Sequence, residues 1–160
     1  MESTITSIIA VLGTLGGALV AGVLHSRSAA RSEQAALRER LRRERQDAAQ
    51  SLIRALKAHR RNLYTRWKLK TLRASDEAQE AARFESWNTR SEVTDAQDAL
   101  RLVTDDTELL HRADAAVGAS LALSEVDDTT TQAVMDTRGD AARAAHAAFV
   151  AAAARCINGV

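Results

Sequence analysis

The stretch LRRERQDAAQSLIRALKAHRRNLYTRW, residues 41–67, decides the fold. Its apolar residues recur at spacings of four and seven, the pattern of one buried face of an α-helix. They are Leu41, Ala48, Leu52, Leu56, Leu63 and Trp67. Nothing from about Ser32 to Leu72 breaks a helix, and the chain contains no proline. The stretch therefore predicts one long helix that packs against others along this stripe.

Three further helices are predicted downstream, each opened by polar capping residues. The start signals are Ser75 or Asp76, Thr104–Asp106 with Asp105 and Glu108 at capping-box spacing, and Asp127–Thr129. The second helix is expected to turn Val93, Ala96, Leu100 and Val103 inward, with Phe84 and Trp87 nearby. For the last two helices the expected inward residues are Leu110, Ala113, Val117 and Leu121, and then Ala145, Phe149, Ala152 and Cys156. Asn158–Gly159 is a stop signal for the last helix.

Upstream of this stretch, Ser3 to Leu24 form 22 residues without a charge. About 20 helical residues cross a ~30 Å hydrocarbon core, so the segment predicts a single transmembrane helix. The alternative is a cleaved signal peptide, although such peptides carry a basic start and a shorter apolar core. Six arginines follow Leu24 within 20 residues and none precedes it. Since arginine resists translocation, we expect the N-terminus outside and the C-terminal domain in the cytoplasm, at the cell membrane.

Two interactions with the membrane environment are predicted around this span. Gly13, Gly17 and Ala21 recur every four residues, a spacing that lets two helices pair closely, although glycine is also simply common in membrane helices. On the cytoplasmic side, a basic flank meets anionic lipid. The expected headgroup contacts are Arg27, Arg31 and Arg38.

Short connections between the predicted helices imply antiparallel neighbours. The expected fold is all-α, with an N-terminal single-pass transmembrane helix (3–24), a charged juxtamembrane stalk helix (25–45) and a cytoplasmic antiparallel bundle of about four helices (46–160). Charge is divided unevenly, because residues 25–73 hold 15 Lys and Arg against four Asp and Glu, whereas residues 74–160 hold seven Arg against 16 acids. We expect the basic first helix to pack beside the acidic helices.

The segment RALKAHRRNLYTRWKLKTLR, residues 54–73, interleaves basic and aromatic side chains. Such a pattern suits the phosphate backbone of nucleic acid or an anionic lipid surface. The candidate nucleic-acid contacts are Arg60, Arg61, Arg66, Lys68 and Lys70. The alternative, which we prefer, is that Leu63 and Trp67 lie in the core and the charges face acids or water, so that nucleic acid is not expected as a partner.

No catalytic, metal or cofactor site is predicted. The four histidines, His25, His59, His111 and His146, lie on different predicted segments and are expected at the surface. Cys156 is the single cysteine, and no glycine-rich phosphate loop or nucleophile elbow occurs. An enzyme is therefore not expected.

Three stretches together resemble a known family. They are IIAVLGTLGGALVAGVL (8–24), WNTRSEVTDAQDALRLVTDD (87–106) and AARAAHAAFVAAAA (141–154). The chain resembles the small actinobacterial membrane proteins of the KilB family, the Kil-type plasmid spread proteins of Streptomyces. The resemblance implies a role in moving plasmid DNA alongside a separate DNA-pumping ATPase, and it brings no catalytic residues.

The expected function is that of a non-enzymatic, membrane-anchored interaction or scaffold protein acting in plasmid spread or DNA transfer. Its expected partners are membrane lipid, further copies of itself in a homo-oligomer, and a partner membrane protein or the DNA-transfer machinery. The alternative is a membrane-tethered nucleic-acid-binding protein that uses the basic helix 54–73. Because phosphate binding weakens steeply with salt, a salt titration distinguishes the two.

Overall fold

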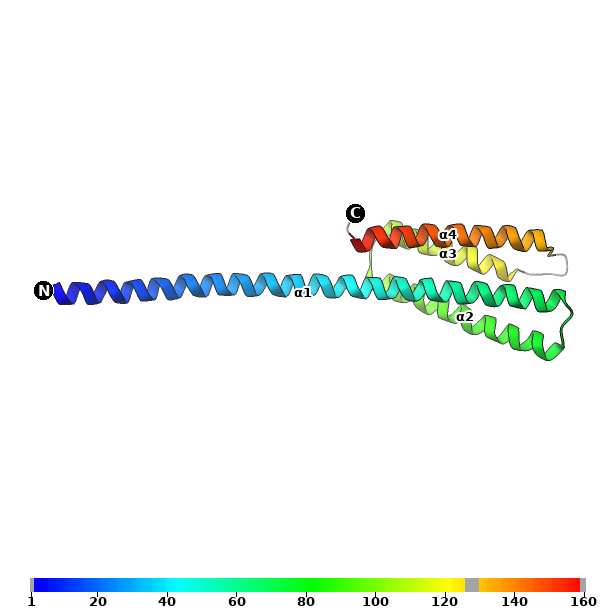
Figure 1. Ribbon diagram of the computed structural model, residues 1–160, viewed down its shortest axis with the longest axis horizontal. Coiled ribbons are helices and arrows are strands. Elements are labelled where there is room, and N and C mark those ends of the chain that lie inside the picture. Colours follow the sequence, from blue (N-terminus) through cyan, green and yellow to red (C-terminus); the bar gives the residue numbers. More distant parts are fainter. Residues whose placement is uncertain (1, 126–129, 159–160) are drawn as a thin grey trace. The chain divides into compact units, whose positions relative to one another are not determined.

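The computed structural model describes residues 2–125 and 130–158, and the side chains of residues 31–125 and 130–157. Within these ranges it contains four α-helices, one short 3-10 helix and no strand. The helices are α1 (Glu2–Thr71), α2 (Asp76–Val103), α3 (Thr107–Leu121) and α4 (Gln132–Asn158), with η1 (Ala122–Ser124) after α3 (Figure 1). The predicted all-α class is confirmed. By its contacts the chain forms two compact units, Met1–Leu41 and Arg42–Val160.

The first unit consists of the first part of α1, whose backbone is helical from Glu2 onward. The side chains of the predicted span 3–24, including Gly13, Gly17 and Ala21, lie outside the described residues, as does that of Arg27. Among the side chains that are described, no helix offers a stretch long and apolar enough to cross a bilayer.

The second unit is a bundle in which α2 runs antiparallel to the C-terminal part of α1. Far from their connecting turn, Arg45 Nε donates to the Val103 carbonyl at 3.1 Å. Closer to the turn, His59 Nδ1 lies 3.1 Å from Thr89 Oγ1. From the first contact to the second, the position advances along α1 from Arg45 to His59 and goes back along α2 from Val103 to Thr89. The two helices are therefore antiparallel.

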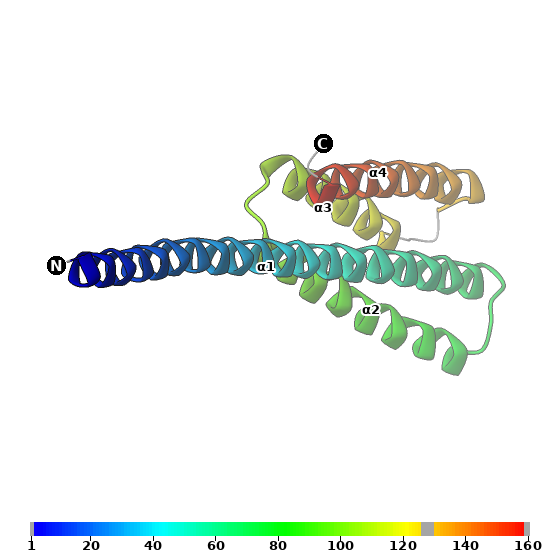
Figure 2. The same ribbon diagram turned by 60° about the vertical axis from the view of Figure 1, so that its left-hand side comes forward.

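Helix α4 also runs antiparallel to this part of α1. Arg42 Nε donates to the Ile157 carbonyl at 3.0 Å, and Arg60 Nη1 donates to the Ala142 carbonyl at 3.2 Å. Helix α3 packs along α4, and both views show the two side by side (Figures 1 and 2). The short connection between α1 and α2 gives antiparallel neighbours, as predicted.

Two arginines of α1 bind the C-terminal ends of other helices. Val103 is the last residue of α2, and Ile157 is the penultimate residue of α4. The last carbonyls of a helix have no partner within it and carry a partial negative charge. Arg45 and Arg42 satisfy one such carbonyl each. The basic first helix is therefore held in part by helix ends.

The helix starts follow local capping. Of the two predicted alternatives, Ser75 and Asp76, it is Ser75 that caps α2, with its Oγ accepting from the Ala78 amide at 3.4 Å. For α3 the predicted cap, Asp105, is wrong by one residue, because the Asp106 carboxylate accepts from the Leu109 amide at 2.8 Å. The Thr104 hydroxyl accepts from the Asp106 amide, and the helix therefore starts one residue later than predicted. The predicted start signal at 127–129 lies outside the described residues.

The core of the second unit forms two apolar clusters. The larger joins all four α-helices through Leu52, Leu56, Leu100, Leu109 and Phe149, among others. The smaller contains Leu63, Trp67, Leu123, Met135 and Ala142. The buried stripe predicted on α1 is therefore confirmed for Leu52, Leu56, Leu63 and Trp67.

Three apolar residues that sequence patterning placed in or near the core lie outside it. Leu41 is 42% exposed, because it belongs to the first unit, where α1 is the only described element. Phe84 and Trp87 are 62% and 60% exposed. On α2 the inward positions are Ser86, Thr89, Val93, Ala96 and Leu100, and this spacing turns Phe84 and Trp87 away from them.

Candidate functional site

The basic segment 54–73 lies on α1 within the second unit, and one face of it is packed. Leu56, His59, Leu63 and Trp67 are each 6% exposed or less. Trp67 Nε1 also donates to the Thr130 carbonyl at 3.3 Å, which fixes the ring. The predicted burial of Leu63 and Trp67 is confirmed, and the cationic residues of the segment take the remaining faces.

The five candidate nucleic-acid contacts do not share one surface. Arg60 and Arg61 line a groove between α1 and α4, whereas Arg66 and Lys70 line another between α1 and α2. Lys68 is exposed and lines neither groove. Successive residues on a helix are about 100° apart, so a continuous basic run must distribute its charges around the axis.

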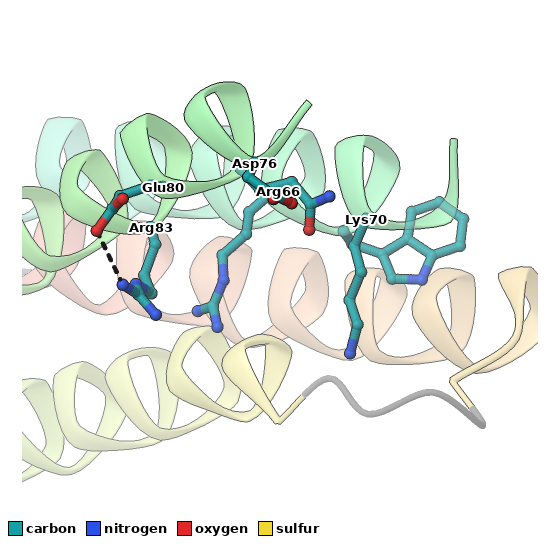
Figure 3. A pocket seen from close by; sticks show the side chains of 7 residues that line it. Arg66, Lys70, Asp76, Glu80 and Arg83 are labelled. Atoms are coloured by element: carbon teal, nitrogen blue, oxygen red, sulfur yellow. Dashed lines mark hydrogen bonds and ion pairs between the residues drawn. The ribbon is translucent and has the colours of Figure 1, made fainter. Parts of the chain in front are cut away.

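The groove between α1 and α2, here called the hairpin groove, has a volume of about 370 Å³. Its lining residues are Arg66, Trp67, Lys70, Asp76, Gln79, Glu80 and Arg83. Figure 3 shows Arg66 and Lys70 extending in the same direction from α1, as residues four apart on a helix do. Arg83 forms an ion pair with Glu80 at 3.2 Å. With three cations and two acids, this groove is nearly balanced in charge.

The groove between α1 and α4, here called the α1–α4 groove, has a volume of about 360 Å³. Its walls come from Lys57, Arg60, Arg61, Tyr64 and Thr65 of α1, Leu123 of η1, and Met135, Asp136, Gly139 and Arg143 of α4. Four of these residues are cationic and only Asp136 is acidic. The α1–α4 groove is therefore the more electropositive of the two.

Like charges lie close together in the α1–α4 groove. Burial and the neighbouring Arg143 guanidinium hold the pKa of Arg60 below its usual value. Arg60 donates to a neutral backbone carbonyl, that of Ala142. Arg143 pairs with Asp140 on its own helix. The arrangement can accept an anion, because a bound negative charge would relieve the repulsion between the two guanidinium groups.

Two histidines occupy buried positions, which corrects the expectation that they lie at the surface. His59 is 1% and His146 is 9% exposed. Burial, with a smaller contribution from Arg90, lowers the pKa of His59 to about 4, and burial beside Arg60 and Lys57 lowers that of His146. Both imidazoles are therefore neutral at neutral pH.

The Cys156 thiol is not activated as a nucleophile. Burial and the Asp106 carboxylate raise the pKa of the Cys156 thiol, which lowers its reactivity. Among the described residues, no group of three His, Cys, Asp or Glu side chains could hold a metal ion.

Sequence patterning missed Arg143 and Gly139 as members of the α1–α4 groove. Both belong to α4, more than 70 residues after Arg61 in the chain. Only the antiparallel register, with Ala142 opposite Arg60, brings them to the basic face of α1. Hydrophobic periodicity indicates which face of each helix is buried, but not which residues of two helices lie opposite each other.

Comparison with known proteins gives two matches. A family model described as "KilB plasmid transfer protein" matches residues 46–157. A curated protein named Protein KilB, from Streptomyces lividans, is 41% identical over 90 residues, which cover 56% of this chain and 58% of that protein. The chain thus matches less than two thirds of the length of this relative. No solved structure matches the chain.

Proposed function

Because the chain belongs to the KilB plasmid transfer family, we propose that it is a non-enzymatic, membrane-anchored interaction protein that acts in plasmid spread. The observation that carries the proposal is the extent of the family match. Residues 46–157 include nearly all of the second unit and its core. This match supports the four-helix bundle as the part that carries the proposed role.

The membrane anchor of this proposal is the uncharged segment 3–24, with the bundle on the cytoplasmic side. Among the proposed headgroup contacts, Arg31 and Arg38 are exposed, as contact with lipid requires. Gly13, Gly17 and Ala21 would pair two spans and so bring copies together.

The proposed interaction role is supported by the outer face of α2. Phe84 and Trp87 lie three residues apart and are both about 60% exposed. The Arg83 guanidinium lies 5.8 Å from the centre of the Trp87 ring. Tryptophan and arginine are the side chains most enriched at the energetic centres of protein interfaces. We propose that this face contacts the DNA-transfer machinery or another copy of the chain.

A complementation experiment tests the proposed function. A plasmid lacking its own kilB function is placed in a Streptomyces host that expresses this chain, and plasmid spread through the mycelium is scored. We expect spread to be restored by the full chain and by Leu102→Ser, which changes an exposed residue of α2. Loss is expected on deletion of residues 3–24 and for Phe84→Ser with Trp87→Ser. Failure of the full chain to restore spread, although it accumulates, would remove the proposed role.

Topology is tested separately with an exposed reporter cysteine. Cys156 is half-buried, so it is replaced by serine, and Leu102, which is 87% exposed, is replaced by cysteine. A membrane-impermeant thiol reagent should leave intact cells unlabelled and label the protein after lysis without denaturant. Labelling in intact cells would place the bundle outside and contradict the proposed orientation.

A further inference from the structure

The α1–α4 groove has a surplus of positive charge. Lys57, Arg60 and Arg61 stand on α1, and Arg143 stands on α4. Asp136 is the one acidic residue among the groove's described lining residues, and Asp140 pairs with Arg143 beside it. Even when both acids are counted, the cations are in excess.

This excess is held at close range between two helices. Arg143 lies near enough to Arg60 to lower its pKa, so the two guanidinium groups repel each other. The Arg143 guanidinium also lies over Gly139, where an added Cβ would be 3.4 Å from its Nη1 atom. This is an ordinary van der Waals separation, so the guanidinium lies directly along the surface of α4 at Gly139. Planar guanidinium groups match the oxygens of phosphate in geometry as well as in charge.

The groove also offers an apolar floor and an aromatic edge. Leu123 and Met135 are 4% and 1% exposed, whereas Tyr64 is 44% exposed. The Tyr64 ring is positioned by Trp67, with ring centroids 5.5 Å apart, and its hydroxyl accepts from Gln132 Nε2 at 3.4 Å. A volume of about 360 Å³ is in the range of small-ligand sites. The groove could thus hold one planar base beside a row of cations.

We propose that the α1–α4 groove binds single-stranded nucleic acid, with backbone phosphates on Arg61 and Arg143 and one unstacked base against Tyr64. This inference goes beyond the proposed function and does not depend on it. Duplex DNA fits less well, because its bases stay stacked and offer no free face to the Tyr64 ring. An acidic protein segment brings a planar ring only where it contains an aromatic residue, whereas every nucleotide carries a planar base beside its phosphate. Arginine with aromatic side chains is the usual combination for binding unpaired strands.

The hairpin groove provides a matched comparison within the same bundle. Arg66 and Lys70 also lie on α1 and carry the same number of charges as Arg61 and Arg143. Their groove is nearly neutral, since Asp76 and Glu80 line it as well. Removal of two charges from either groove changes the net charge of the protein equally, but only one change affects the proposed site.

The test measures binding of fluorescein-labelled oligothymidylate of twelve nucleotides to the full-length chain in non-ionic detergent, by fluorescence anisotropy between 50 and 200 mM salt. Arg61→Gln with Arg143→Gln should weaken binding at least tenfold and flatten the plot of log K against log salt by about 1.4, since each phosphate on a single strand contributes about 0.7. Arg66→Gln with Lys70→Gln should change the affinity less than threefold. Circular dichroism checks that each variant keeps its helical content.

A second variant separates base contact from charge. Tyr64→Ala should weaken binding about tenfold without changing the salt dependence, because it removes a stacking surface and no charge. A duplex of the same length should bind at least tenfold more weakly than the single strand, and poly-glutamate should compete poorly. The proposal is overturned if the strand does not bind, if both double variants lose affinity equally, or if duplex or poly-glutamate binds as well as the single strand.

Discussion

Replacement of Trp67 by alanine should destabilise the bundle by about 3 kcal/mol. Trp67 is 6% exposed and belongs to the smaller core cluster with Leu63, Leu123 and Met135. Burial of roughly 200 Å² of aromatic surface at about 25 cal/mol per Å² is worth about 5 kcal/mol. Alanine retains part of that burial and the cluster closes partly around the gap, whereas the hydrogen bond from Nε1 to Thr130 is lost. These opposing effects leave a net loss of about 3 kcal/mol.

The measurement is urea unfolding of the full chain in non-ionic detergent, followed by circular dichroism at 222 nm. With a slope of about 1.5 kcal/mol per molar urea for a bundle of this size, the midpoint should fall by about 2 M. Trp87→Ala is the matched control, because Trp87 is 60% exposed and should cost less than about 0.5 kcal/mol. Equal midpoint shifts for the two variants would refute the assignment of Trp67 to the core.

Three further predictions follow from single contacts. The pKa of His59 is about 4 in the folded chain and about 6.5 when unfolded. The unfolded state therefore binds the proton first, and stability should fall by about 2 kcal/mol, after allowance for solvent screening, as the pH is lowered from 7 to 4. His59→Leu should flatten this dependence in urea titrations, and an unchanged slope would contradict it. Arg45→Ala should cost about 1–2 kcal/mol through the lost bond to Val103, whereas Arg54→Ala, at an exposed position, should be nearly neutral in the same assay. Gly17→Ile should reduce pairing of the 3–24 segment in a bilayer dimerisation reporter by about tenfold, and an equal signal would make the glycines incidental.

The helices could be predicted from the sequence because their determinants are local. The α1 stripe at Leu52, Leu56 and Leu63 follows from helical periodicity, and the start of α2 follows from the capping preference of Ser75. The start of α3 shows where local rules become ambiguous, since Asp105 and Asp106 are both competent caps. There the hydrogen bond between Thr104 Oγ1 and the Asp106 amide selects the second.

The candidate site could be predicted only in part, because it depends on register between helices. The basic segment on α1, including Tyr64, is evident in the sequence, but the way its charges divide between two grooves is not. Packing of Leu63 and Trp67 places Arg60 and Arg66 in different grooves. Arg143 lies in an alanine-rich segment that carries no basic cluster of its own. It reaches the α1–α4 groove only because α4 packs beside α1 with Ala142 opposite Arg60.

The two arginines that bind helix ends also bear on how the protein is made. Arg45 finds its acceptor, the Val103 carbonyl, as soon as α2 has left the ribosome, whereas Arg42 must wait for Ile157. Synthesis at roughly 5–20 residues per second separates these events by about 3–10 seconds. The α1–α2 hairpin can therefore close while α4 is still being translated. During that interval the inward residues of α1 that face α4 are uncovered, and a nascent chain stalled before α4 should be the form that chaperones capture.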